Sequence, residues 1–141
     1  MASERDLVSG VIQLANLLNR RLAPLFEKSK VTPQQWAVLS ALSDAEAPET
    51  LVMLARRLAV TKQNMTGMIA RLEQLGMLEK QDDPTDLRSS RIVLTRRGRN
   101  LVERLRPSYR EWLASIGGED VSEKEIQTLT RTVERLIARL E

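Results

Sequence analysis

The chain has 141 residues, 42% of them hydrophobic and 29% charged, which is the composition of one folded domain rather than of a disordered segment. Its 22 basic and 19 acidic side chains leave a modest net charge of +3. There is no cysteine and no histidine, which excludes disulfides, thiolate and imidazole metal sites and Ser–His–Asp catalysis, so neither an enzyme nor a bound cofactor is expected.

The first predicted helix covers about residues 5–26. Its apolar residues recur every three or four positions, the spacing of a coiled-coil seam, and further apolar side chains widen the seam into a face. The seam consists of Leu7, Val11, Leu14, Leu18, Leu22 and Leu25. Such a face is buried against the helix's own domain or against a second subunit, and the length of the helix favours the second subunit.

Three shorter helices are predicted next, and each begins at a threonine. Thr32 is placed to cap the first of them, with Pro33 at the first helical position, where its missing N–H is not needed. Thr50 caps a short second helix and Thr61 caps a third. Gly76 stands where a left-handed residue would end that third helix.

A change in apolar period predicts strands from Leu78 onward. Leu78 alternates with Glu79, and Ile92 and Leu94 alternate with their neighbours, so two short strands are expected. Residues 82–90 between them contain a proline, three aspartates and two serines, which is typical of a loop. The sequence therefore predicts a hairpin with a long polar tip.

Two longer helices complete the predicted chain. Thr95 caps the first, which runs to about residue 116, and Pro107 inside it should produce a kink. Ser122 and Glu125 form a capping box at the start of the last helix. The apolar residues of that helix again recur at intervals of three and four, which favours burial against a partner subunit.

The order of these elements is that of a winged helix-turn-helix, because a basic hairpin follows two helices joined only by residues 59–61. Residues 62–76 resemble the recognition helix of the MarR family of bacterial and archaeal regulators, and residues 83–98 resemble its wing, with D-x-R at the tip and T-x-x-G after the next strand. The resemblance implies a mainly α fold with a small β-hairpin wing. It implies a single domain over residues 1–141, with a winged helix-turn-helix lobe at 32–98 and helical dimerisation regions at 1–31 and 99–141.

The resemblance assigns DNA contacts to the recognition helix and the wing. A helix fits the major groove, where Gln, Asn, Lys and Arg side chains pair with base edges or phosphates. The outward residues there are Lys62, Gln63, Asn64, Thr66, Gly67 and Arg71, with Thr61 as cap and phosphate contact. Arg88 at the wing tip enters the minor groove, beside Ser89 and Arg91, and Asp86 pairs with either Arg88 or Arg91. Many members carry a bulky or charged residue where Gly67 stands, so fewer or water-mediated base contacts are expected.

The resemblance also implies a homodimer, a pseudo-palindromic double-stranded DNA operator and a pocket for a small aromatic or phenolic ligand between the dimer helices and the lobe. Cations and aromatic rings suit a phenolic carboxylate. The candidates are Arg20, Arg21, Trp36, Tyr109 and Trp112. Both tryptophans lie on apolar stripes, so core packing is the stronger interpretation for each.

The predicted function is a sequence-specific transcriptional regulator, in the first place a repressor, that occludes a promoter and is released by a small ligand. The charge distribution supports an anionic partner: residues 51–110 hold 13 basic and 6 acidic side chains, a net charge of +7, against −1 for residues 1–50 and −3 for 111–141. A solvated basic surface explains this charge equally well. Two alternatives stay open, a sequence-tolerant architectural DNA-binding protein and a protein–protein adaptor that has lost DNA binding.

Secreted, membrane and calcium-binding proteins are disfavoured by the sequence. The N-terminal residues lack the apolar stretch of a secretory signal, and the longest apolar run covers only residues 51–55, so no membrane partner is expected and the cytoplasm is the expected compartment. Asp82, Asp83 and Asp86 lack the glycine and distal glutamate of an EF-hand, which indicates a polar turn rather than a metal site.

Overall fold

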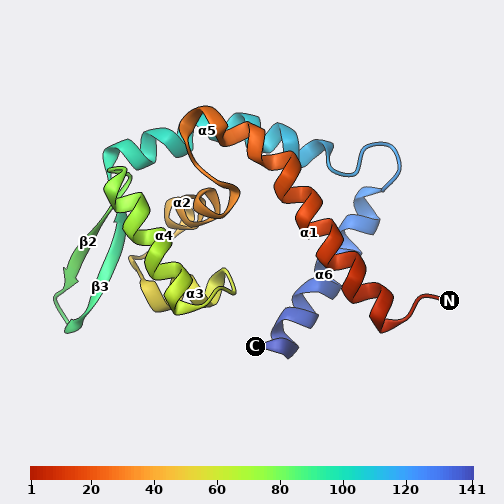
Figure 1. The fold of residues 1–141 in the computed structure, drawn as a ribbon, viewed down its shortest axis with the longest axis horizontal. Coiled ribbons are helices and arrows are strands. Elements are labelled where there is room, and N and C mark those ends of the chain that lie inside the picture. The colour runs from red at the N-terminus through yellow and green to blue at the C-terminus, as the bar shows by residue number, and fades with distance from the viewer. The chain divides into compact units, whose positions relative to one another are not determined.

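The computed structural model describes the backbone of all 141 residues and the side chains of residues 1–85 and 89–141. The fold is mainly helical with a small antiparallel sheet, which confirms the predicted fold class (Figure 1). The elements are α1 (Glu4–Phe26), the 3-10 turn η1 (Glu27–Ser29), α2 (Pro33–Asp44), β1 (Glu49–Thr50), α3 (Leu51–Arg57), α4 (Lys62–Gln74), β2 (Leu78–Asp83), β3 (Asp86–Leu94), α5 (Arg96–Ser115) and α6 (Glu123–Leu140). The chain divides into two compact units, Met1–Arg106 and Pro107–Glu141.

Side-chain caps start the helices where the sequence predicts them. The hydroxyls of Thr32, Thr50, Thr61 and Ser122 each accept a hydrogen bond from the backbone N–H three residues further on, at 3.1–3.3 Å. Each bond satisfies a backbone donor that has no partner inside its helix, and such a cap contributes about 1 kcal/mol. Local sequence therefore fixes the start of α2, α3, α4 and α6.

The sheet differs from the prediction in the length and number of its strands. Its strands lie in the order β1-β3-β2, and all pair antiparallel. Residues 82–90, predicted as a loop, lie mostly in β2 and β3, and β1 was not predicted at all. The outer part of the β2–β3 ribbon is paired through its backbone but shows no apolar alternation. Most of β2 is exposed on both faces, so its side chains need not be apolar on either one.

The core of Met1–Arg106 is formed by the inner faces of α2, α3 and α4, the base of the sheet and the start of α5. Its fully buried side chains include Val38, Leu39, Leu54, Met65, Ile69, Leu72, Leu78, Ile92 and Val102. Phe26, at the end of α1, stacks on Trp36 of α2 with ring centroids 5.0 Å apart and an interplanar angle of 23°. This stack ties the end of α1 to the core.

The second unit, Pro107–Glu141, contains the end of α5 and all of α6. The helix α5 runs unbroken from Arg96 to Ser115, so Pro107 does not end it, and the division between the two units falls at this proline. Every residue of α6 is exposed, including the apolar residues of its predicted seam. None of the helices in the described part of the chain is long and apolar enough to cross a membrane.

Candidate nucleic-acid interface

The helix α4 presents a polar face outside the lobe. Met65, Ile69 and Leu72 are fully buried, which places their side of the helix against the core of the lobe. All the predicted contact residues of this helix and its cap are exposed: Thr61, Lys62, Gln63, Asn64, Thr66, Gly67 and Arg71. The predicted orientation of α4 is therefore confirmed, while the contacts themselves remain a prediction.

The two threonines of this face have already used part of their hydrogen-bonding capacity. Thr61 Oγ1 accepts from the Asn64 N–H at 3.1 Å, which makes it the cap of α4. Thr66 Oγ1 donates to the Lys62 carbonyl at 2.9 Å, so this hydroxyl can only accept a hydrogen bond from a further partner. Beside them, a Cβ atom on Gly67 would meet no other atom within 4 Å. Gly67 is thus a gap in the outer face of the helix.

Asp83 organises the turn at the end of the wing, the β2–β3 ribbon. Its carboxylate accepts hydrogen bonds from the Thr85 N–H at 2.9 Å and the Thr85 hydroxyl at 2.7 Å. Ser89 Oγ donates to Oδ2 at 3.3 Å, and Arg91 Nη2 lies 3.4 Å from Oδ1. The Thr85 hydrogen bonds, with the charge of Arg91 and the Ser89 hydroxyl adding to them, hold the pKa of Asp83 below its ordinary value.

Sequence reasoning missed Asp83 and chose its neighbour Asp86 as the carboxylate that stabilises the wing. Asp83 followed two residues later by Thr85 is the pattern of an Asx turn, and this signal could have identified it. The predicted roles of Asp86 and Arg88 concern side chains that lie outside the described residues. Among the described side chains, the arginine that pairs with Asp83 is Arg91.

An ion pair between a buried glutamate and an exposed arginine joins the sheet to the first helix of the helix-turn-helix. Glu49 in β1 is only 3% exposed, and its Oε1 accepts a hydrogen bond from Arg57 Nη2 at the end of α3. The next residue, Thr50, both ends β1 and caps α3. Because β1 pairs with β3, this contact connects the base of the wing to α3. Neither Glu49 nor Arg57 was predicted to take part in the site.

The T-x-x-G pattern after the wing holds the start of α5 against the end of α4. Thr95 Oγ1 donates to the Gly76 carbonyl at 2.6 Å and accepts from the Gly98 N–H at 3.1 Å. The Thr95 N–H donates to the Met77 carbonyl at 3.1 Å. Gly76 has a φ of +73°, the left-handed conformation that the sequence predicted for this position. These hydrogen bonds therefore join residues 76–77, which precede the wing, to residues 95–98, which follow it.

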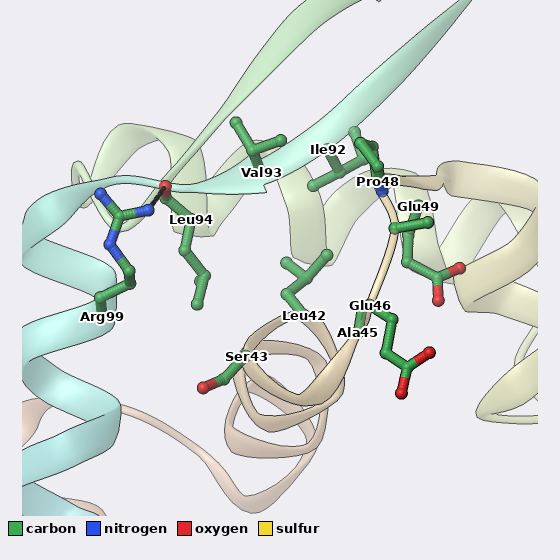
Figure 2. Close-up of a pocket in the computed structure, with 11 residues that line it drawn as sticks. Leu42, Ser43, Ala45, Glu46, Pro48, Glu49, Ile92, Val93, Leu94 and Arg99 are labelled. Atoms are coloured by element: carbon green, nitrogen blue, oxygen red, sulfur yellow. Dashed lines mark hydrogen bonds between the residues drawn. The ribbon is translucent and has the colours of Figure 1, made fainter.

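A hollow of about 260 Å³ lies behind the wing base, between the end of α2, the α2–β1 loop and β3 (Figure 2). Its wall is largely apolar and includes Leu42, Ile92 and Leu94. Arg99 of α5 donates from Nη1 to the Leu94 carbonyl at 3.2 Å, and Figure 2 shows Glu49 on the opposite side of the hollow. The backbone of β3 thus holds Arg99 at the rim.

The predicted ligand residues fall in both units. Arg20 and Arg21 are exposed on α1, whereas Trp36 is 3% exposed and stacked on Phe26, which confirms its interpretation as a core residue. In the second unit, the ring centroids of Tyr109 and Trp112 lie 6.3 Å apart, and the two rings make an interplanar angle of 50°. Two aromatic pairs are therefore formed, Phe26–Trp36 in one unit and Tyr109–Trp112 in the other.

Solved structures share this architecture over more than nine tenths of the chain. The S. aureus MepR–DNA complex has a TM-score of 0.83 at 20% identity and covers 93% of this chain and 95% of its own. NadR in complex with 4-hydroxyphenylacetate has a TM-score of 0.80 at 23% identity and covers 97% and 94%. At these identities the likeness establishes the fold.

Other relatives have a higher sequence identity to this chain. The transcriptional activatory protein BadR of Rhodopseudomonas palustris is 35% identical over 128 residues, which is 89% of this chain and 71% of BadR. The homoprotocatechuate degradative operon repressor of Escherichia coli is 28% identical over 133 residues, covering 94% and 88%. The family model for the MarR family matches residues 29–89, which contain the helix-turn-helix and most of the wing. The chain belongs to the MarR family, and it is a transcriptional regulator.

Proposed function

We propose that the chain binds operator DNA as a homodimer, with α4 in the major groove and the wing tip in the minor groove. The observation that carries the proposal is the outer face of α4 with its cap, where seven exposed positions are polar, cationic or glycine while Met65, Ile69 and Leu72 on the inner face are fully buried. Lys62, Gln63 and Asn64 stand in the first turn of that helix, the part that reaches base edges when a recognition helix enters the groove. Arg88 and Ser89 extend the surface onto the wing, and Arg71 is a candidate phosphate contact.

The apolar surfaces of the terminal helices support the dimer. On α1, the exposed residues Leu7, Val11 and Leu14 belong to the predicted seam. On α6, Leu129 and Val133 are 53% and 40% exposed, although a lone folded chain normally buries such a stripe. Two copies related by a two-fold axis present two copies of α4, so the proposed operator is pseudo-palindromic.

We further propose that a small aromatic or phenolic acid releases the DNA and that the basal action is repression by occlusion of a promoter. NadR was solved with 4-hydroxyphenylacetate, and the Escherichia coli relative named above is a repressor of a homoprotocatechuate degradative operon. Arg20, Arg21, Tyr109 and Trp112 remain the candidate ligand residues. We also propose that the protein acts in the cytoplasm, where it meets chromosomal DNA, and that it works by binding rather than by catalysis.

The test is selection of binding sites from randomised DNA, followed by fluorescence-anisotropy titration of the selected site against random competitor. A regulator prefers its site by about 10³-fold or more. Gln63→Ala should reduce that preference, with a loss of about 1–3 kcal/mol at one base position. Gln74→Ala, the same change at the far end of the same helix, is the matched control and should change nothing.

Two outcomes would contradict the proposal. Salt-dependent binding without any preferred sequence would identify an architectural DNA-binding protein, and the absence of salt-dependent binding would identify an adaptor. Adding 4-hydroxyphenylacetate to the protein–DNA complex tests the ligand, since the anisotropy should fall only if that acid releases the DNA.

A further inference from the structure

A second hollow, here called the basic pocket, lies within Met1–Arg106 between η1 and the first turns of α5. Its volume is about 640 Å³, and five cationic side chains line it: Lys28, Lys30, Arg96, Arg97 and Arg104. Its lining contains no acidic residue among the described side chains, and Glu27 and Glu103, close by in the sequence, stay outside it. Such a concentration of one charge in a concave surface produces a strong positive potential.

No ion pair among the described side chains neutralises the charges of the basic pocket. Ion pairs among the described side chains involve Arg57, Arg91 and Arg106, and none of the five pocket cations forms one. Two of the five, Arg96 and Arg97, stand in the first turn of α5, where the helix dipole favours anions and repels cations. In the free protein these positive charges repel one another and the N-terminal end of the helix dipole. A bound anion would replace this repulsion with attraction.

The α5 wall of the basic pocket is held in place by the core. Thr95 and Gly98 fix the first turn of α5 to Gly76 and Met77, as described above. The aliphatic stem of Arg97 lies against Gly76, with its Cδ 3.8 Å from the position of a Cβ there. Met77 and Leu101, each 4% exposed, form an apolar floor. The backbone at the start of α5 is thus already fixed before binding, which reduces the ordering cost for the arginines that it carries.

The basic pocket is separate from the proposed DNA surface. None of the exposed α4 residues assigned to DNA lines it, and no described wing-tip residue lines it. It lies beyond the C-terminal end of α4, next to Met77, whereas Lys62 to Asn64 lie at the other end of that helix. In Figure 1 the tip of the β2–β3 ribbon likewise points away from the start of α5.

We propose that the basic pocket binds a small molecule that carries two or more phosphate groups. Five cationic side chains without a carboxylate among them favour a ligand that carries several negative charges. A ligand with a single carboxylate carries only one. Three of the five are arginines, whose guanidinium groups match the oxygens of phosphate in bidentate geometry. The volume admits a compact oligophosphate or the diphosphate part of a larger molecule, with Met77 and Leu101 to contact its apolar portion.

The probe is inorganic triphosphate, titrated into the full chain by isothermal calorimetry at fixed ionic strength, with pyrophosphate and orthophosphate as comparisons. We expect one site per protomer and affinity that rises from orthophosphate to triphosphate. The double variant Arg97→Gln/Arg104→Gln should weaken triphosphate binding by at least about tenfold. The control Arg5→Gln/Arg110→Gln removes the same charge from helical positions that do not line the pocket. It should weaken binding less than about twofold, since neither side chain can contact the phosphates and salt screens the attraction from more distant charges.

A second pair of changes tests the opposite wall without touching α5. Lys28→Gln/Lys30→Asn should also weaken triphosphate binding, and asparagine suits position 30, whose φ is +58°. Equal weakening by the pocket and control variants would show that only net charge matters and would overturn the proposal, as would binding that orthophosphate matches.

Operator binding separates the basic pocket from DNA as the phosphate source. Without triphosphate, Arg97→Gln/Arg104→Gln should keep the operator affinity and salt dependence of the control variant. A salt slope reduced by about two charges relative to the control would make the pocket part of the DNA surface and the proposal wrong.

Discussion

A Cβ atom on Gly98 would lie 2.0 Å from the carbonyl oxygen of Met77, closer than any real Cβ contact. That carbonyl also accepts the Thr95 N–H, so it cannot move away without breaking the bond that joins the wing to α5. The glycine of T-x-x-G is therefore required by the close approach of two backbone segments. The preceding threonine is required by the hydrogen bonds that hold these segments together.

Gly98→Ala should lower the free energy of unfolding by about 1–3 kcal/mol, because the added methyl group forces the two backbones apart. Gly67→Ala is the matched control: the same substitution at an exposed helical position with open space should raise the free energy of unfolding by up to about 1 kcal/mol. Urea unfolding followed by circular dichroism measures both. A Gly98→Ala protein as stable as the wild type would mean that the contact is not maintained in solution.

Gly67→Arg should raise non-specific DNA affinity and steepen its salt dependence by about one charge, because it fills the gap in the outer face of α4 with a cation. It should also change the preferred sequence if the side chain reaches a base edge. Selection on randomised DNA and salt titrations, performed on both proteins, measure these effects. Identical sequences and identical salt slopes would show that this face of α4 does not meet DNA.

Arg88→Ala should weaken operator binding by about 1–3 kcal/mol and leave the thermal unfolding midpoint unchanged, because its proposed role is contact with the minor groove. Fluorescence anisotropy at one fixed salt concentration measures the first effect and calorimetry the second. Unchanged affinity would remove the wing tip from the interface, whatever the result for α4.

Protonation of Asp83 should loosen the wing turn at low pH. The hydrogen bonds from Thr85 lower the pKa of the folded protein's Asp83, so the carboxylate stabilises the fold fully above the unfolded pKa. That stabilisation disappears as the pH falls through the lowered, folded-state pKa. Carboxyl ¹³C and Thr85 amide shifts followed by NMR should titrate together below the pH at which a free aspartate titrates. In Asp83→Asn the Thr85 titration should vanish, and a Thr85 shift that persists there would assign the effect to another group.

Removal of residues 122–141 should abolish the dimer, because this segment contributes the exposed apolar stripe of α6. Analytical ultracentrifugation of the truncated protein measures its oligomeric state, and circular dichroism shows whether the lobe remains folded. A truncated protein that sediments as a stable dimer would place the dimer contacts elsewhere.

Features encoded within a few residues could be predicted from the sequence. The caps at Thr32, Thr61 and Ser122 and the left-handed Gly76 depend on hydrogen bonds and backbone geometry inside one turn, so composition and spacing reveal them. The outer face of α4 follows from the same local period, because Met65, Ile69 and Leu72 claim the inner face.

Features that depend on distant pairing could not be predicted in the same way. The short strand β1 exists because Glu49 meets Ile92 of β3, far along the chain, and two residues carry no periodic signal of their own. The contacts of Ser89 and Arg91 with Asp83 likewise form only when β2 pairs with β3, which no local pattern specifies. Arg57 likewise becomes a partner of Glu49 only after β1 has joined the sheet.

The shared use of Thr50 by β1 and α3 has a mechanical consequence for regulation. Within residues 49–57, the end of β1, the Thr50 cap of α3 and the Glu49–Arg57 ion pair are directly connected. The wing base and α3 should therefore move together as one rigid body. Tilting the wing against α3 would break all three contacts together. A small ligand would therefore release DNA more easily by changing the distance between the two DNA-binding lobes of a dimer than by deforming either lobe. Two rigid lobes fit the two half-sites of an operator at only one separation.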